Sequence, residues 1–192
     1  MGLASGRFHD RMPIWIDKVE PIRVPSARLI IDHNPLLGDA FAMQHTLIIL
    51  KPDCVQRRLA GTVLARFEAK GLKLVGLKLI QVTKALAEQH YAEHSARPFF
   101  GGLIDFITGG PVIVGVLEGN EAISVVRNLL GATNGAAAAP GTVRGDFSIS
   151  KQNNLVHGSD SPESAAREIA LWFPEGVASY DIAGSTWVFD GA

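Results

Sequence analysis

The chain has 192 residues, a length that suits one domain with a modest extension. Hydrophobic residues make up 47% of it, which is typical of a globular protein with a substantial buried core. Charged residues make up 19% and the formal net charge is −1, which argues against a general nucleic-acid binder and against a membrane-surface binder.

The first 43 residues differ in composition from the rest of the chain. They hold all three methionines, including Met43, and they lack the continuous apolar segment of a signal peptide. We expect an N-terminal extension over residues 1–43 and a single compact domain over residues 44–192. Two interpretations of the extension stay open: an appendage, ordered or disordered, and an upstream start with Met43 as the true first residue.

Apolar runs and helical stripes alternate from residue 45 onwards. The sequence HTLIILKPD (45–53) predicts a strand that Pro52 closes, and LKLVGLKLIQV (72–82) predicts a second strand. Between these two strands, the apolar residues Leu59, Val63 and Phe67 recur at helical spacing, which predicts a helix that ends at Gly71. Two further helices are predicted over residues 84–96 and 99–110.

The middle of the chain contains the clearest strand, PVIVGVLEG (111–119). A helix is predicted over residues 120–132, with Asn120 as its N-cap. Residues 133–147 are too rich in glycine, proline and small side chains to predict regular structure. A loop of that length inside a compact domain is usually functional or disordered.

The last predicted strand is NLVH (154–157), and the helix SPESAAREIALWF (161–173) follows it. Ser161 can cap this helix, and Pro162 suits its first turn. With the middle helices removed, the element order is βαββαβ. The sequence therefore predicts an α+β fold of the ferredoxin-like class, a four-stranded antiparallel sheet with helices on its faces.

A histidine, His157, stands at the end of the last predicted strand. Taken alone, such a histidine is most often an ordinary polar residue. Here Gly158 leaves room for close approach to the ring, Ser159 and Asp160 add a hydroxyl and a carboxylate, and the next helix carries Glu168. This setting makes His157 a candidate nucleophile.

Glu168 is the candidate third group of this constellation. Glu163 and Arg167 are spaced to form an ion pair on the solvent side of the helix. Glu168 has no basic residue three or four positions away and shares a flank with Ala165 and Trp172. A partly desolvated carboxylate there can orient an imidazole and support its positive charge, although Glu168 alone would be taken for a solvated glutamate.

Three separate cations are candidates for phosphate binding. Lys51 ends the first strand, Arg127 lies near the end of a helix, and Arg144 lies in the glycine-rich loop. Each alone is more often a surface charge, but together they suit a triphosphate. Neither a GxxxxGK[ST] pattern nor a GxGxxG pattern occurs, so neither standard phosphate-binding loop is predicted.

The remaining histidines and the single cysteine give weaker signals. His90 and His94 are four residues apart, but the motif is not HExxH and no third ligand is near in sequence, so we expect no metal site formed by the protein alone. His45 has no evident partner. A single cysteine, Cys54, excludes an internal disulfide and is compatible with a cytoplasmic location, which we expect.

Several motifs together resemble those of the nucleoside diphosphate kinase family. They are TLIILKPD, HYAEHSARPFF, PGTVRGDF and above all NNLVHGSDS, and the likeness runs over residues 45–189. The resemblance implies a ferredoxin-like fold and transfer of the γ-phosphate from a nucleoside triphosphate to a nucleoside diphosphate. It implies a ping-pong reaction through a phosphohistidine on His157, which maintains nucleoside triphosphate pools, with Mg²⁺ carried by the nucleotide phosphates.

The same resemblance implies how the nucleotide is bound. Lys51 would reach the phosphates and sugar hydroxyls, and Asn154 would bond to the sugar 3′-OH. Phe99 would stack on the base, with Leu103 nearby, and Tyr91 would help to position the phosphate. Base contact through stacking would allow broad nucleotide use, because every base has a π-face.

It further implies that Arg127, Thr133 and Arg144 grip the phosphates, and that Ser159 and Glu168 support the histidine. Members of the family form hexamers or tetramers. We expect a homo-oligomer, a hexamer of paired trimers, with a tetramer as the alternative. The C-terminal tail is long, and its Trp187 and Phe189 rings need burial, which favours the hexamer.

Two departures from the family pattern stand out. Lys151 replaces an apolar residue in the base pocket, and its methylene stem can still line that pocket. Gly135 replaces a proline in a loop that packs between subunits in the family, which affects assembly strength more than chemistry.

The competing interpretations are a non-catalytic nucleotide-binding or regulatory module and a nucleic-acid-binding protein. Filled catalytic positions argue against the first, and the near-neutral charge argues against the second.

Overall fold

A computed structural model describes residues 43–189, so the interpretation of residues 1–43 as an extension lies outside the described residues, apart from Met43. The strands are β1 (Met43–Leu50), β2 (Lys73–Gln81), β3 (Pro111–Asn120) and β4 (Val156–Gly158). The α-helices are α1 (Pro52–Gln56), α2 (Ala60–Ala69), α3 (Lys84–His90), α4 (Phe100–Thr108), α5 (Ala122–Leu130), α6 (Val143–Phe147) and α7 (Pro162–Trp172). The 3₁₀ helices are η2 (Ala92–His94), η3 (Gly135–Ala137) and η4 (Ser185–Trp187).

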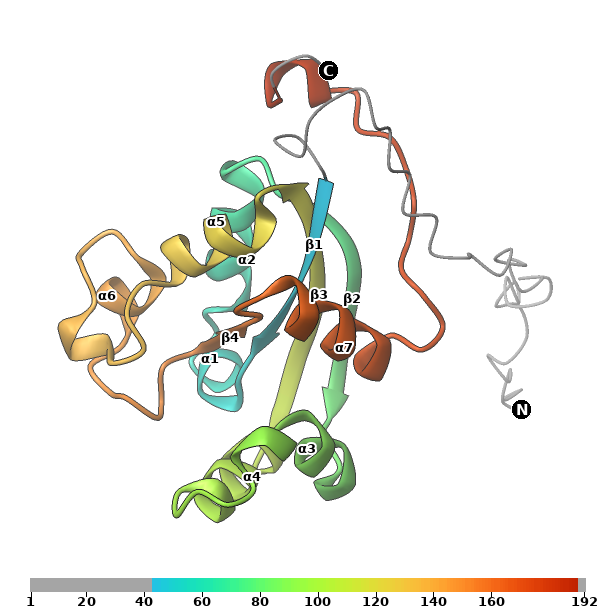
Figure 1. The fold of residues 1–192 in the computed structure, drawn as a ribbon. Helices are drawn as coiled ribbons and strands as arrows, with labels where there is room; N and C mark the ends of the chain where they lie inside the picture. The colour runs from blue at the N-terminus through green and yellow to red at the C-terminus, as the bar shows by residue number, and fades with distance from the viewer. Residues whose placement is uncertain (1–42, 190–192) are drawn as a thin grey trace, which may run out of the picture. The chain divides into compact units, whose positions relative to one another are not determined.

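The strands form one four-stranded sheet in the order β2-β3-β1-β4, with every neighbouring pair antiparallel (Figure 1). This arrangement confirms the predicted α+β class and the ferredoxin-like fold. β1 is central, and its register with β4 pairs Ile49 with His157. The short strand β4 therefore places the candidate nucleophile beside the C-terminal half of β1, next to Lys51.

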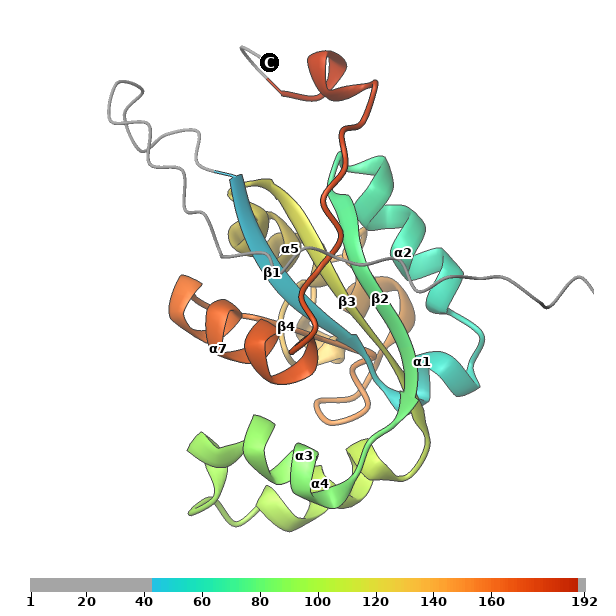
Figure 2. The same cartoon turned by 90° about the vertical axis from the view of Figure 1, so that its right-hand side faces the viewer.

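Helices cover both faces of the sheet, and the alternation of side chains along β1 divides the core between them (Figures 1 and 2). Leu47 and Ile49 pack in a cluster with residues of α3, α4 and α7. Ile48 and Leu50 point to the other face and pack with residues of α2 and α5. All four side chains are fully buried, so β1 is held by apolar packing on both sides.

The helix α7 forms as its sequence predicts. Ser161 accepts a hydrogen bond from the backbone N–H of Ser164 at 3.1 Å, and the Ser164 hydroxyl bonds to the backbone N–H of Ser161 at 2.9 Å. Pro162 occupies the first turn, where a missing N–H costs nothing. These contacts fix the start of the helix three residues after β4, which sets the position of Glu168.

Other local predictions were wrong. Asn120 is the last residue of β3, and the cap position of α5 is Glu121, which has a left-handed backbone with φ of 50°. The glycine-rich segment contains η3 and α6, since the side chain of Thr142 accepts a hydrogen bond from Gly145 N–H and caps α6. The predicted helix over residues 84–96 ends at His90 and continues as η2.

The segment after α7 runs back along the sheet to β2. The Tyr180 hydroxyl donates to the carbonyl of Leu74 at 2.7 Å, and the Lys73 ammonium lies 4.5 Å from the Tyr180 ring centre. Trp187, for which burial is expected, is 91% exposed in the single chain. Within residues 43–189, the structure contains no helix long and apolar enough to span a bilayer.

Candidate active site

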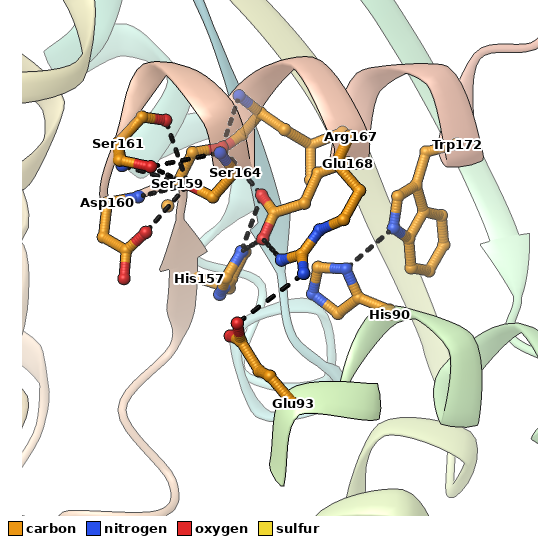
Figure 3. Close-up of polar contacts among 12 residues, drawn as sticks. His90, Glu93, His157, Ser159, Asp160, Ser161, Ser164, Arg167, Glu168 and Trp172 are labelled. Atoms are coloured by element: carbon orange, nitrogen blue, oxygen red, sulfur yellow. Dashed lines mark hydrogen bonds and ion pairs between the residues drawn. The ribbon is translucent and has the colours of Figure 1, made fainter.

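His157 lies at one side of a cleft between β4, α7 and the α3–η2 segment (Figure 3). Its Nε2 atom is 3.1 Å from both carboxylate oxygens of Glu168. The Ser159 hydroxyl donates to Glu168 Oε2 at 2.7 Å and accepts the N–H of Leu47 at 3.1 Å. The imidazole is therefore oriented by a carboxylate that is itself tied to the central strand.

The protonation of Glu168 decides the role of each imidazole nitrogen. Burial alone would raise the pKa of this carboxyl group, but its hydrogen bonds to His157 and Ser159 hold the pKa below the ordinary value. An ionised carboxylate only accepts hydrogen bonds, so Nε2 of His157 must carry the proton that it donates. In the neutral ring, Nδ1 then keeps its lone pair and is the nitrogen available for attack.

Lys51 is held in place by the loop that precedes β4. Its ammonium donates to Asn154 Oδ1 at 2.6 Å, and the Asn154 amide nitrogen donates to the carbonyls of Thr133 and Lys151 at 2.8 and 2.9 Å. Burial, followed by the nearby charge of Arg144, lowers the pKa of Lys51 to about 8. Asn154 thus joins Lys51 to the glycine-rich segment.

Arg144 is nearly fully buried and donates to three backbone carbonyls. These acceptors are Asn154 at 3.3 Å, Gly131 at 2.9 Å and Val156 at 2.6 Å. A guanidinium has five N–H donors, so two remain for a ligand. Burial, followed by the charge of Arg127, lowers the pKa of Arg144 to about 10, which keeps it charged at neutral pH.

A cavity of about 240 Å³ unites most of the residues singled out from the sequence. Those that line it are Lys51, Tyr91, Leu103, Arg127, Thr133, Arg144, Asn154, His157 and Glu168. Ser159 lies behind Glu168, fully buried. Phe99 is 56% exposed and stands outside the cavity lining, with its ring 5.8 Å from that of His94.

Asp160, expected beside His157, also lines the cavity, together with residues to which the sequence alone gave no role in the site, namely His90, Glu93, His94 and Val156. His90 and His94 do not act as a pair: Nδ1 of His90 accepts a hydrogen bond from the Trp172 indole at 3.1 Å, and His94 lies near Glu93. No local pattern could reveal the role of His90, because Trp172 is 82 positions away in the chain.

Two local expectations about β4 and α7 were wrong. A Cβ atom on Gly158 would lie 3.0 Å from Leu130 and 3.2 Å from Val126, so this glycine allows β4 to pack on α5 and does not make room for the His157 ring. Arg167 is not paired with Glu163 in the structure. Its guanidinium lies 3.6 Å from Glu93 and 3.9 Å from Glu168.

His45, for which the sequence suggested no partner, lies 3.0 Å from Glu118 across the β1–β3 ladder. Glu118 also accepts a hydrogen bond from Lys73 at 2.9 Å. This cluster joins β1, β3 and β2 at the end of the sheet away from the cavity. The geometry therefore gives these residues a structural role, in which they hold the three strands together and take no part in the site.

Divalent metals can be tested against the same geometry. Within residues 43–189, one set of three potential ligands lies close together, His90, His157 and Glu168, with donor atoms within 4.8 Å of one another. Mg²⁺ prefers oxygen ligands in octahedral geometry. This histidine-rich set does not suit it, whereas the cations that line the cavity, Lys51, Arg127 and Arg144, suit phosphate groups.

Comparison with known proteins identifies relatives of the chain. Residues 44–177 match the family model described as nucleoside diphosphate kinase. A nucleoside diphosphate kinase from Rhodopirellula baltica is 64% identical over 131 residues, which cover 68% of this chain and 86% of the relative. Nucleoside diphosphate kinase B from Flaveria bidentis is 53% identical over 148 residues, 77% of this chain and all of the relative.

Solved structures show the same similarity. A halophilic nucleoside diphosphate kinase from Halobacterium salinarum, determined in complex with CDP, superposes with a TM-score of 0.75. It is 47% identical, and the match covers 77% of this chain and 99% of that one. A nucleoside diphosphate kinase family protein from Babesia bovis gives a TM-score of 0.74 at 48% identity, over 76% of this chain and 99% of that one.

Proposed function

The chain belongs to the nucleoside diphosphate kinase family and is a phosphotransferase of that kind, and we propose that it works through a phosphohistidine on His157. A nucleoside triphosphate would give its γ-phosphoryl group to the imidazole, and a nucleoside diphosphate would then take it. The cellular role would be to maintain nucleoside triphosphate pools.

The observation that carries this proposal is the Glu168 carboxylate, with both oxygens 3.1 Å from His157 Nε2. It leaves Nδ1 as the nitrogen with a free lone pair. In the first half-reaction Nδ1 attacks the γ-phosphorus, the bond to the bridging oxygen breaks, and the nucleoside diphosphate leaves with that electron pair. Positive charge develops on the ring, and Glu168 stabilises it.

The second half-reaction reverses these bond changes. A terminal oxygen of the incoming diphosphate attacks the phosphorus, the N–P bond breaks, and the electron pair returns to Nδ1. Neither step needs a proton from water, so the protein mainly aligns the groups and neutralises charge. One site then serves both substrates, because donor and acceptor differ only by the group that is transferred.

Lys51, Arg127 and Arg144 would bind the phosphates, together with the hydroxyl of Thr133. Lys51 and Arg144 are already fixed by carbonyl and amide oxygens before a nucleotide arrives. Such preorganisation reduces the entropy lost on binding. Mg²⁺ would enter as part of the nucleotide substrate and would neutralise phosphate charge when bound.

The exposed ring of Phe99, with Leu103 in the cavity wall, would receive the base. Tyr91 is buried, and its ring centre lies 6.3 Å from that of His157, which suits a role in placing the phosphate. Asn154 Oδ1 accepts from Lys51 and has a second lone pair, with which it could accept the sugar 3′-OH. Lys151 would face the base through its methylene stem.

We also propose that the chain assembles into a homo-oligomer, a hexamer or alternatively a tetramer. The edge strand β2 exposes Leu77 by 48% and Leu79 by 66%, and the segment before β4 exposes Ile149 by 90%. Leu77 and Leu79 lie two residues apart on the edge strand, and exposed apolar side chains on a sheet edge favour burial against another copy. Light scattering at micromolar concentration tests this, and a monomeric mass would contradict it.

The domain proposal is that residues 44–192 form the catalytic unit and residues 1–43 an extension. The family match over residues 44–177 supports the boundary. We propose a cytoplasmic location, which the use of one cysteine is compatible with. Mass spectrometry of the protein isolated from its native source tests whether residues 1–42 are present.

The experiment that tests the reaction is transfer of label from ATP that carries ³²P in its γ-phosphate. Wild type should take up an acid-labile, base-stable label, and any nucleoside diphosphate should remove it. The variant His157→Gln should take up none. Label retained by this variant, or absent from folded wild type, would show that His157 is not the phosphoryl carrier.

A further inference from the structure

A second histidine, His90, lies against the candidate nucleophile and has no part in the reaction described above. It is the last residue of α3 and is 3% exposed. Its ring meets that of His157 edge to face, with centres 4.7 Å apart and planes at 83° (Figure 3). A buried imidazole so close to a reacting imidazole affects both its orientation and its charge.

The hydrogen bond from Trp172 determines the tautomer of His90. An indole N–H can only donate, so Nδ1 of His90, 3.1 Å away, must be an acceptor without a proton. The neutral ring then carries its proton on Nε2. Burial, and next the neighbouring His157, lowers the pKa of His90 to about 3, which keeps the ring neutral at physiological pH.

One helix face controls both histidines. Glu168 and Trp172 are four residues apart on α7, so they lie on the same side of the helix. Glu168 contacts Nε2 of His157, and Trp172 contacts Nδ1 of His90. The two contacts favour opposite charge states of the two rings. The carboxylate supports a positive charge on His157, whereas the indole donor opposes protonation of His90 at Nδ1.

The other ring nitrogen of His90 has no partner in the described part of the chain. Nε2 is buried and makes no hydrogen bond. A set of two histidines and one carboxylate, as in His90, His157 and Glu168, is a familiar zinc ligand set. Zinc would need a lone pair on Nε2 of His90, but the indole contact places a proton there.

We propose that Trp172 and His90 form a tautomer lock beside the nucleophile. The lock holds His90 as a neutral ring with its proton on Nε2, and His90 acts as a positioning residue that keeps the His157 ring oriented towards Glu168. It also prevents this cluster from binding a transition metal. The proposal rests on His157 as the phosphoryl carrier.

The surroundings of His90 explain why neutrality matters. The charged and titratable groups that face it are Tyr91, with its ring centre 4.5 Å away, His157 on β4, Glu168 and Arg167 on α7, and His94 on η2. A protonated His90 would compete for the Glu168 carboxylate and would repel the positive charge that develops on His157. Loss of the lock should therefore slow phosphorylation at acidic pH.

The first test reads the tautomer directly by ¹⁵N NMR of the full-length wild type, with ring signals assigned by comparison with His90→Asn. We expect a proton on Nε2 and none on Nδ1 from pH 5.5 to 8, and no shift of the His90 signals when Zn²⁺ is added. A proton on Nδ1, an imidazolium in this range, or Zn²⁺ ligation by His90 would overturn the proposal.

The second test uses the rate of phosphoenzyme formation as a function of pH. Trp172→Phe removes the indole donor, and Phe173→Leu is the control for lost packing at the same helix end, since Phe173 is also buried. We expect Trp172→Phe to gain an acidic limb, about threefold slower at pH 5.5 than at pH 7.5 relative to wild type, because Nδ1 of His90 then lacks the indole donor that favours the neutral ring and can take up a proton.

The added variant His90→Asn in the Trp172→Phe background should abolish this limb, because an amide does not titrate. A Trp172→Phe profile that matches Phe173→Leu, or a limb that survives in the double variant, would contradict the lock. If wild type itself takes up no label, the fault lies with the proposed nucleophile, so failure of the two proposals can be distinguished.

Discussion

Replacement of Glu168 by glutamine is the sharpest perturbation of the proposed chemistry. Glutamine keeps the length of the side chain and an oxygen that can accept from His157 Nε2, but it removes the negative charge. The carboxylate lies 3.1 Å from Nε2 and is 4% exposed, so little water screens the interaction. The variant therefore tests charge support for the ring separately from ring orientation.

The expected size follows from the energy of a hydrogen bond to a charged group, about 1.5–3 kcal/mol. Two unit charges at this separation would attract by about 5 kcal/mol at an effective dielectric constant of 20, which is an upper limit because the amide dipole replaces part of the interaction. If the hydrogen-bond energy of about 1.5–3 kcal/mol is lost only in the transition state, phosphorylation slows by about 10- to 150-fold.

Rapid-quench measurement of phosphoenzyme formation in a single turnover is the assay. The control is Glu163→Gln, the same change on the same helix at an exposed position, which should leave the rate unaltered. A loss under about threefold for Glu168→Gln, or an equal loss in the control, would refute the role assigned to the carboxylate.

Stability should respond to the same substitution in a pH-dependent manner. The pKa of Glu168 is below its ordinary value in the folded protein, so its ionised form stabilises the fold above the unfolded pKa of 4.5. That contribution is lost as the pH falls through the folded pKa. Wild type should therefore lose more stability on acidification below pH 4.5 than Glu168→Gln, as measured by urea unfolding.

Three further predictions concern other residues. Because the pKa of Lys51 is about 8, its ammonium is present below that pH and lost above it, so kcat/KM for nucleotides should fall above pH 8, and Lys51→Arg should remove this limb. Gly158→Ala should lower the free energy of unfolding by about 1–3 kcal/mol in urea, since the new methyl group would meet Leu130 at 3.0 Å and Val126 at 3.2 Å. Cys54 is fully buried and burial raises its thiol pKa to about 12, so alkylation at pH 8 should be slow until the protein unfolds. Unchanged profiles, unchanged unfolding midpoints or rapid alkylation of the native protein would contradict these in turn.

The sheet and its main helices could be predicted because their signals are local. Period-two and apolar runs mark the strands, and the sequence from Ser161 carries its own helix cap. The helix α6 was missed because composition suggested a loop, whereas a single side chain, Thr142, caps a five-residue helix there. Asn120 was misjudged because pairing with Met43 extends β3 through it.

The candidate site divides in the same way. His157, Ser159 and Glu168 lie within twelve residues of one another, so a strand–turn–helix prediction already brings them together. Lys51 and Arg144 were singled out as cations, but no sequence pattern indicated their partners. Asn154, which holds Lys51, is 103 positions away, and the carbonyls that hold Arg144 come from segments on either side of it. His90 lay beyond sequence reasoning, since its environment depends on Trp172, packed against it only in the folded chain.

The central claim is that Nδ1 of His157 carries the phosphoryl group. Proton–phosphorus correlated NMR of the isolated phosphoenzyme tests it most directly, because coupling of ³¹P to the ring protons differs between the two nitrogens. We predict one phosphohistidine, at residue 157, with phosphorus on Nδ1 and the Nε2 proton still bonded to Glu168. Phosphorus on Nε2, or on any other residue, would contradict the account.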